Sequence, residues 1–225
     1  MPRGLLIVFE GAEGAGKSTQ LKLLADALGS RGHNVVAVRE PGGTVLGDEI
    51  RRLLLDPTMH LDIVPRAEAL LFMASRAQLV EQEIRPALES GAIVLLDRFF
   101  LSTYAYQGAG RGLGEADLRS ANGVATSGLV PDLVLLLTLP VSEGLSRAAQ
   151  RGAHDRIEQT ELVFHERVSR AFVQFAAPEW QREHPECGPI VVVDAAGTEA
   201  EVYERIWAEL HARWPGTFPI GQRVG

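Results

Sequence analysis

LLIVFEGAEGAGKST, residues 5–19, is an apolar run of strand-forming residues that stops in a glycine-rich turn and continues into a helical pattern. Gly11 to Ser18 has the spacing glycine, four residues, Gly-Lys-Ser, which lets successive backbone N–H groups curl around a phosphate. The helix that begins near Lys17 points its positive dipole end at the same place. A glycine-rich turn that binds nothing is the alternative, and the strand before the turn and the helix after it argue against that alternative.

Two side chains in this loop have a direct chemical use. Lys17 supplies a mobile positive charge for the β- and γ-phosphates of a nucleotide, and the Ser18 hydroxyl is a hard oxygen ligand for Mg²⁺. The loop therefore predicts a site for nucleotide phosphates and a metal ion. The residues predicted to line it are Gly11, Ala12, Glu13, Gly14, Ala15, Gly16, Lys17, Ser18 and Thr19.

Length and composition limit the kind of protein this is. The 225 residues, 46% of them hydrophobic, are enough for one α/β core, so we expect a single domain over residues 1–214. Residues 215–225 lack periodicity and are expected to form a flexible tail. The net charge of −7 argues against a nucleic-acid partner, which normally needs a basic face. The one cysteine, Cys187, excludes an intrachain disulfide and fits a reducing compartment.

The apolar runs are too short to target the chain to a membrane or to cross one. The run at residues 5–9 ends in Glu10. The longest later run, residues 133–139, is bounded by Asp132 and Pro140 and is typical of a buried strand. We therefore expect no membrane partner and a cytoplasmic location.

Strand and helix patterns alternate along the chain, which favours an α/β fold with a parallel sheet. Thr44 is a candidate cap for a helix that Asp56-Pro57 closes, and Thr198-Glu-Ala-Glu201 is a capping box that opens the last helix. The long helical patterns cover residues 64–89 and 159–183. The expected strands are residues 5–9, 33–38, 92–97, 133–139 and 189–194.

The third expected strand ends in a carboxylate, Asp97, and the opposite charge of Arg98 follows it directly. Because ligands of parallel α/β sheets lie at the carboxyl ends of strands, both side chains should emerge beside the phosphate loop. A carboxylate there can hold Mg²⁺ through water, which predicts Asp97 as a metal ligand together with Ser18. The alternative is a salt bridge of the two residues with each other or with neighbours.

Two further segments carry groups suited to a planar polar ring. Phe72 and Arg76 lie four residues apart on one helical face, although such a pair more often serves packing or a cation–π contact than a ligand. Residues 99–112 combine hydroxyl, amide and aromatic groups, among them Thr103 and Gln107. Taken alone, this second segment would pass for an amphipathic turn.

Arginines gather in the segment around residue 150. Arg147 and Arg151 lie one helical turn apart, and Arg156 follows a glycine hinge. One interpretation is a solvated helix face on which Glu143 pairs with Arg147. With a phosphate loop elsewhere in the chain, the same arginines predict a lid over about residues 147–158 that closes on a transferring phosphoryl group.

Five motifs follow one another along the chain: FEGAEGAGKST at 9–19, REPGGT at 39–44, DRF at 97–99, AYQG at 105–108 and DRIEQ at 155–159. In this order they resemble the thymidylate kinases, and the bacterial type with arginines in its lid in particular. The phosphate loop alone is shared by many nucleotide-binding proteins. The REPGG motif together with the two later segments is highly specific.

The resemblance implies a P-loop fold of the nucleoside monophosphate kinase type, a doubly wound sheet of about five parallel strands flanked by helices, and a homodimer. It also implies phosphorylation of dTMP to dTDP by direct in-line transfer from ATP with Mg²⁺. A kinase for another nucleoside monophosphate or for a nucleoside remains an alternative. A nucleotide-binding switch that hydrolyses slowly is another.

The resemblance also assigns roles to individual residues. It implies that Phe72 stacks on thymine and that Glu13 meets the deoxyribose 3′-hydroxyl. Polar side chains are expected to hydrogen-bond the base, and two arginines to hold the acceptor phosphate. The side chains expected on the base are Arg76, Thr103 and Gln107. The arginines expected on the acceptor phosphate are Arg98 and Arg51.

The cations that neutralise the transferring group are expected to come from the lid. Some relatives carry an arginine inside the phosphate loop, but Glu13, Gly14 and Ala15 offer none here. The lid arginines are then the available donors. The complete set of predicted catalytic residues is Lys17, Arg98, Arg147, Arg151 and Arg156.

Arg151→Ala is predicted to lower kcat at least tenfold with near-normal dTMP affinity, because an arginine that meets the transferring phosphoryl group acts mainly in the transition state. Steady-state kinetics with ATP and dTMP measure both quantities. An unchanged kcat would assign Arg151 to a solvated helix face.

Overall fold

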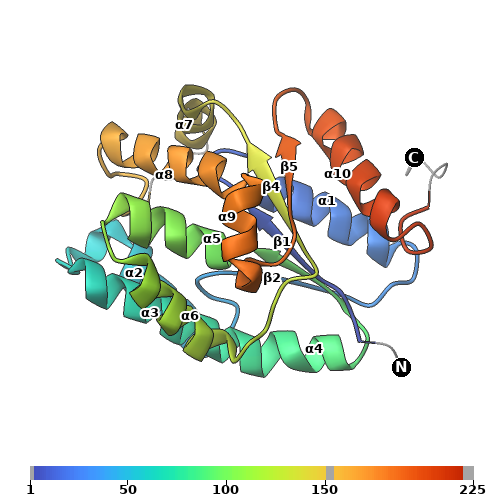
Figure 1. Cartoon of the computed structure of the whole chain (residues 1–225), viewed down its shortest axis with the longest axis horizontal. Helices are drawn as coiled ribbons and strands as arrows, with labels where there is room; N and C mark the ends of the chain where they lie inside the picture. The colour runs from blue at the N-terminus through green and yellow to red at the C-terminus, as the bar shows by residue number, and fades with distance from the viewer. Residues whose placement is uncertain (1–2, 151–154, 220–225) are drawn as a thin grey trace.

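The computed structural model describes residues 3–150 and 155–219 and consists of a central sheet with helices on both faces (Figure 1). The strands are β1 (Leu6–Glu10), β2 (Val35–Arg39), β3 (Ile93–Asp97), β4 (Leu133–Thr138) and β5 (Ile190–Asp194). The α-helices are α1 (Lys17–Gly29), α2 (Val45–Leu55), α3 (Pro65–Leu79), α4 (Arg85–Glu89), α5 (Phe100–Thr103), α6 (Glu115–Thr126), α7 (Val141–Gln150), α8 (Leu162–Phe175), α9 (Pro178–Glu183) and α10 (Glu199–Arg213). The short 3₁₀ and π segments are η1 (Pro57–Met59), η2 (Val80–Ile84), η3 (Tyr104–Gly110) and η4 (Pro185–Cys187).

The five strands lie in the order β2-β3-β1-β4-β5, and every neighbouring pair is parallel. The strand that carries the phosphate loop, β1, is therefore central, with β3 on one side and β4 on the other. The chain moves from β1 to β2 at one edge, returns to β3, and then crosses to β4 on the other side of β1. The predicted doubly wound, five-stranded parallel sheet is confirmed.

The three central strands, β1, β3 and β4, are buried on both faces because alternate side chains enter different cores, whereas the edge strands β2 and β5 are partly exposed. In β1, Leu6 and Val8 pack with α3, α6 and α8, whereas Ile7 and Phe9 pack with α1 and α10. Figure 1 shows α1 and α10 on one side of the sheet and the other long helices on the opposite side. The near-continuous apolar character of the strands is the consequence of this double coverage.

Two predicted helix starts are confirmed by hydrogen bonds. The Thr44 hydroxyl accepts from the backbone N–H of Gly47 at 2.9 Å at the start of α2. At the start of α10, the Thr198 hydroxyl accepts from the N–H of Glu201, and the Glu201 carboxylate accepts from the N–H of Thr198. These bonds satisfy N–H groups that have no partner inside the helix.

The two long helices differ from their predicted form where proline intervenes. The first is continuous from α3 to α4 but passes through the π-helical segment η2, just before Pro86, which lacks an N–H and crowds the preceding turn. The second begins at Leu162 and not at residue 159, and it is broken between α8 and α9 by Pro178. Proline is tolerated in the first turn of α9 because that N–H needs no intrahelical partner.

Residues 215–219, part of the segment expected as a flexible tail, pack against α10. Phe218 is 0% exposed and lies in the core beside Trp207 and Trp214. The Trp207 indole N–H donates to the carbonyl of Pro219 at 3.2 Å. A single aromatic residue such as Phe218 forms no periodic pattern in the sequence. Its buried side chain nevertheless packs residues 215–219 against α10.

Candidate active site

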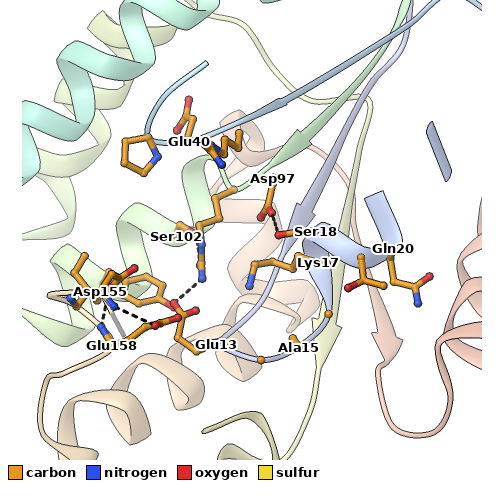
Figure 2. Close-up of a pocket in the computed structure, with 18 of the residues that line it drawn as sticks. Glu13, Ala15, Lys17, Ser18, Gln20, Glu40, Asp97, Ser102, Asp155 and Glu158 are labelled. Atoms are coloured by element: carbon orange, nitrogen blue, oxygen red, sulfur yellow. Dashed lines mark hydrogen bonds and ion pairs between the residues drawn. The ribbon is translucent and has the colours of Figure 1, made fainter. Parts of the chain in front are cut away.

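A cleft of about 580 Å³ opens at the carboxyl ends of β1, β2 and β3. The phosphate loop and the start of α1 form one wall, and side chains from α2, α3 and the α5–η3 segment form the opposite wall. Figure 2 shows Lys17, Ser18 and Asp97 at one end of this space and Glu13, Asp155 and Glu158 at another. The topology therefore brings together segments from the first 160 residues of the chain and the segment around the start of α10, residues 195–202.

The phosphate loop is fixed by close backbone packing. Gly14 has a φ of 70°, and a Cβ built on it would lie 1.9 Å from the carbonyl oxygen of Gly144 in α7. Only glycine fits both the backbone conformation and the space. At the start of α1, Gly16 caps the helix without a side-chain hydrogen bond. The first N–H groups of α1 therefore face the cleft without a capping side chain, an arrangement that suits an anion.

Lys17 is buried at the base of the loop. Its ammonium donates to the carbonyl oxygens of Gly11 and Ala12 at 3.0 and 2.9 Å. An ammonium has three donors, so one remains for a phosphate oxygen. Burial, and then the charge of Arg98, lower the pKa of Lys17 to about 8. The charge of this lysine is therefore sensitive to pH and to the anion placed beside it.

Ser18 and Asp97 lie together, as predicted for a metal site. The Ser18 hydroxyl donates to Asp97 Oδ2 at 2.5 Å, and Asp97 Oδ1 is buried with no hydrogen-bond partner among the described residues. A hydroxyl and a carboxylate are hard oxygen ligands, and Mg²⁺ commonly takes one or two protein ligands and completes its shell with phosphates and water. The two residues fit such an ion and would hold it where it neutralises phosphate charge.

Arg98 is a partly buried cation that lines the cleft. Its guanidinium donates to Glu13 Oε1 at 2.6 Å and to the Ser102 hydroxyl at 3.1 Å, and it lies 5.0 Å from the centre of the Tyr106 ring. Burial by itself would lower the pKa of Arg98, but the neighbouring carboxylates, Glu13 first, raise it well above its usual value. Arg98 has a φ of 73°, a strained conformation that costs about 1–3 kcal/mol and occurs mainly at functional sites.

Two further arginines face the same part of the cleft. Arg51 extends from α2 and donates to the carbonyl of Pro41 at 3.0 Å, and Arg39 comes from the end of β2. Burial, and then the positive charge of Arg39, lower the pKa of Arg51. Arginines close enough to repel one another are stabilised by an anion between them. The arrangement predicted for Arg51 and Arg98 is therefore physically suited to a phosphate.

At the other end of the cleft, Phe72 is half-buried and lines the open space. Thr103 and Gln107 also line it, from α5 and η3. Gln107 Nε2 donates to Glu68 Oε1 at 3.1 Å. An aromatic face, a hydroxyl and an amide thus lie at one end of the cleft, as the sequence indicates for a planar polar ring.

Arg76 is far more constrained than the sequence suggests. It is 1% exposed, and its five N–H groups all have acceptors: Glu40, Phe99, Thr103 and Asn122. Its guanidinium lies over the rings of Phe99 and Phe100, and no cation–π contact joins it to Phe72 among the described residues. A base would receive a hydrogen bond from Arg76 only in exchange for one of these bonds.

The predicted lid arginines lie in different surroundings. Arg147, on α7, lines the cleft and pairs with Glu143 at 2.6 Å, so the predicted helix-face pair is present as well. Arg156 instead donates to Glu68 at 2.5 Å and to the carbonyl of Leu54 at 2.7 Å, and it is not among the cleft-lining residues. The remaining arginine, Arg151, lies outside the described residues.

Several carboxylates that organise the cleft were not predicted. Glu10 is fully buried at the end of β1, where it accepts from the backbone N–H groups of Phe99 and Ser102. Glu40 and Glu68 are also buried, each paired with arginine. Glu10 carries a signal in the sequence, a charge that ends an apolar strand, and Glu40 lies in the REPGG motif, although neither signal reveals the partner of the carboxylate. The partners of Glu40 and Glu68 are too distant along the chain to be found from sequence spacing.

Comparison with known proteins agrees with this geometry. The sequence model of the thymidylate kinase family matches residues 9–206. The chain belongs to the thymidylate kinase family. The match includes the phosphate loop, the residues of both cleft walls and the segment after the lid. The expected membership, which rests on the five motifs, is thereby confirmed, as is the expectation of a nucleoside monophosphate kinase fold.

Individual thymidylate kinases match almost the whole chain. The protein of that name from Deinococcus radiodurans is 48% identical over 95% of this chain and 99% of its own length. The one from Desulfovibrio desulfuricans is 51% identical over 79% of this chain and 85% of its own length. Among solved structures, the crystal structure of thymidylate kinase from Ehrlichia chaffeensis matches with a TM-score of 0.71 and 28% identity, over 93% of this chain and all of that one.

The buried lysine gives a pH-dependent prediction. A phosphate beside Lys17 raises its pKa above 8, so ATP binding at pH 8.5 should take up protons, and ATP affinity should fall as pH rises through about 8 to 9. Calorimetry in two buffers of different ionisation enthalpy measures the uptake. The Lys17→Arg variant, whose cation does not titrate in this range, should lack it. Binding without proton uptake in the unchanged protein would contradict a lowered pKa.

Proposed function

We propose that this protein phosphorylates dTMP to dTDP, with ATP as the phosphoryl donor and Mg²⁺ as the metal, by direct in-line transfer. The observation that supports it is one cleft lined both by a phosphate loop and by a second set of groups suited to a nucleotide. That second set combines the arginines Arg51 and Arg98 with the ring of Phe72 and the amide of Gln107. A protein that only binds ATP would not need this second set of nucleotide-binding groups.

The donor nucleotide is proposed to lie along the loop. Its phosphates would accept hydrogen bonds from the loop N–H groups at the start of α1 and from Lys17. Ser18 and Asp97 are proposed to hold Mg²⁺, which would neutralise phosphate charge when bound. Positioning and charge neutralisation are the main contributions a protein makes to phosphoryl transfer, because the reaction needs little covalent chemistry from side chains.

The acceptor nucleotide is proposed to lie across the cleft from the loop. Arg98 and Arg51 would bind its phosphate, and Phe72 would stack on the base while Thr103 and Gln107 form hydrogen bonds to it. The Thr103 hydroxyl accepts from Arg76 at 2.9 Å, so its own proton stays available for a base oxygen. Glu13, between Arg98 and Tyr106, is proposed to lie near the deoxyribose.

Further positive charge is proposed to come from the lid, as the loop contains no arginine. Arg147 already lines the cleft, and Arg151 follows it by one helical turn in the sequence. Arg156 would reach the phosphates only if it left Glu68 and the end of α2. We therefore propose that Arg147 and Arg151 meet the transferring group and that Arg156 anchors the lid.

The proposed reaction is tested by measuring ADP release in a coupled assay with a panel of acceptors. We expect dTMP to raise ADP release by more than a hundredfold over ATP alone, and thymidine and dAMP to give less than one hundredth of the dTMP rate. A kinase for another nucleotide would prefer a different member of the panel. A nucleotide switch would bind ATP and release ADP slowly with every acceptor.

We also propose a homodimer, the state that the family resemblance predicts. Large apolar side chains stay exposed on adjacent helices, including Leu70 on α3 at 64% and Val124 on α6 at 84%. A second copy would cover such surface, since dimer interfaces are enriched in apolar groups. Sedimentation velocity at micromolar concentration should give twice the chain mass, and Leu70→Glu should shift the protein towards the monomer. A monomer in the unchanged protein would contradict the proposal.

A further inference from the structure

The carboxylate of Glu68 joins three parts of the chain beside the cleft. Glu68 lies on α3, one helical turn before Phe72, and is 1% exposed. It accepts from Gln107 Nε2 at 3.1 Å, from Arg111 at 3.2 Å and from Arg156 at 2.5 Å. Burial by itself would raise the pKa of Glu68, but these hydrogen bonds, that of Arg156 first, lower it below its usual value. Glu68 is therefore an ionised carboxylate.

An ionised carboxylate only accepts hydrogen bonds, which decides the orientation of the Gln107 amide. The amide atom that faces Glu68 has to be the nitrogen, so the carbonyl oxygen points elsewhere. Gln107 lines the cleft, and no described residue donates a hydrogen bond to its Oε1. The atom that Gln107 offers to a ligand is therefore an acceptor.

An acceptor at this position distinguishes between pyrimidines. Thymine and uracil carry an N–H at ring position 3, which can donate to a carbonyl oxygen. Cytosine has a bare nitrogen there, and two acceptors facing each other leave both without a partner, which is costly in a buried site. If the amide were turned over, its N–H₂ group would face the cleft and would suit cytosine.

We propose that Glu68 is a positioning residue that holds the Gln107 amide with its oxygen towards the base, so that the site selects pyrimidines with an N–H at position 3 over cytosine. This proposal rests on the proposed function, in which Gln107 contacts the base. Glu68 itself acts through Gln107 and touches no substrate. Arg111 and Arg156 keep the carboxylate ionised and fixed in place.

A merely structural role for Glu68 makes a different prediction. The same carboxylate ties η3 and the end of the predicted lid to α3, so its loss could loosen the whole cleft. Loosening would lower activity with every acceptor by a similar factor. A positioning role changes the ratio of kcat/KM between two acceptors that differ at ring position 3. It does not change the ratio of kcat/KM between two acceptors that are alike there.

The test is Glu68→Gln, assayed with dTMP, dUMP and dCMP. A glutamine at position 68 presents either its oxygen or its nitrogen to Gln107, so the Gln107 amide becomes free to turn over. We expect the ratio of kcat/KM for dTMP to that for dCMP to fall at least tenfold, about 1.4 kcal/mol of discrimination. The ratio for dTMP to dUMP, which differ only by a methyl group, should change less than twofold. Equal losses with all three acceptors would overturn the proposal.

The chain offers a matched control in Glu186, a partly buried carboxylate far from the cleft that accepts from Tyr104 and Arg119. Glu186→Gln should leave both ratios unchanged. If Glu68→Gln does not fold, Glu68→Asp keeps the charge for the arginines but withdraws the carboxylate from Gln107. This variant should shift the dTMP to dCMP ratio at least threefold in the same direction, and an unchanged ratio in folded protein would overturn the proposal.

A double-mutant cycle separates this proposal from the proposed function. Gln107→Leu removes the amide, and adding Glu68→Gln to it should cause no further change in the dTMP to dCMP ratio if both act through one contact. If the unchanged protein does not phosphorylate dTMP, the proposed function fails. If it does, and Gln107→Leu alters the ratio while Glu68→Gln does not, only the role of Glu68 fails.

Discussion

The buried ion pair between Arg76 and Glu40 holds the acceptor end of the cleft together. Both side chains are almost fully buried, and Glu40 Oε2 accepts from Arg76 Nε and Nη2 at 2.8 and 2.5 Å. The other N–H groups of Arg76 reach Phe99, Thr103 and Asn122, so one guanidinium joins β2, α3, α5 and α6. Removing one partner of such a pair leaves an uncompensated buried charge and typically costs about 3–5 kcal/mol. The wall that carries Phe72 and Thr103 is therefore rigid before any ligand arrives.

Burial and neighbouring charges also decide the properties of the other arginines in the cleft, but these arginines are arranged differently from Arg76. Arg98 is partly buried and also paired with a carboxylate, but its partner Glu13 lies in the phosphate loop, and both face the open space. Arg51 lies near other cations and has a lowered pKa because of burial and Arg39. Every N–H group of Arg76 has an acceptor, although Glu40 Oε1 has no donor among the described residues, so Arg76 supports the fold, whereas a cation near other cations, such as Arg51, is suited to bind an anion. The number of acceptors around each arginine thus separates arginines that support the fold from those suited to bind a ligand.

The proposed reaction depends on this difference between arginines that support the fold and arginines suited to bind a ligand. In that proposal the acceptor wall would hold the base, the phosphate loop would hold the donor phosphates, and the lid would add charge where the two nucleotides meet. Because Arg156 is bonded to Glu68 and α2, the end of the predicted lid is tied to the wall proposed to contact the base. Glu68 contacts both Gln107 and Arg156, so the proposed base contact and the attachment of the predicted lid share one carboxylate.

The sequence by itself determined the fold class, the five strands, the phosphate loop and the closeness of Ser18 to Asp97, the pair proposed to hold Mg²⁺. These features depend on local patterns: apolar runs, glycine spacing, and charges that end a strand. Helix capping at Thr44 and Thr198 was predictable for the same reason. The packing of residues 215–219 was not, because a single buried aromatic ring gives no periodic signal, whereas the proline at position 178 is a local signal for the break that the expected helix over residues 159–183 overlooked.

Only the tertiary structure decided which partners surround each arginine, and therefore which role each arginine is suited to. Arg76, Arg98, Arg147 and Arg156 look alike in the sequence, yet their acceptors come from segments that are distant along the chain. The same holds for Glu40 and Glu68, whose arginine partners cannot be found from the sequence and which are buried beside the cleft. Local patterns specify secondary structure because their interactions lie within a few residues, whereas the role of a buried charge depends on long-range partners that only folding brings within hydrogen-bonding distance.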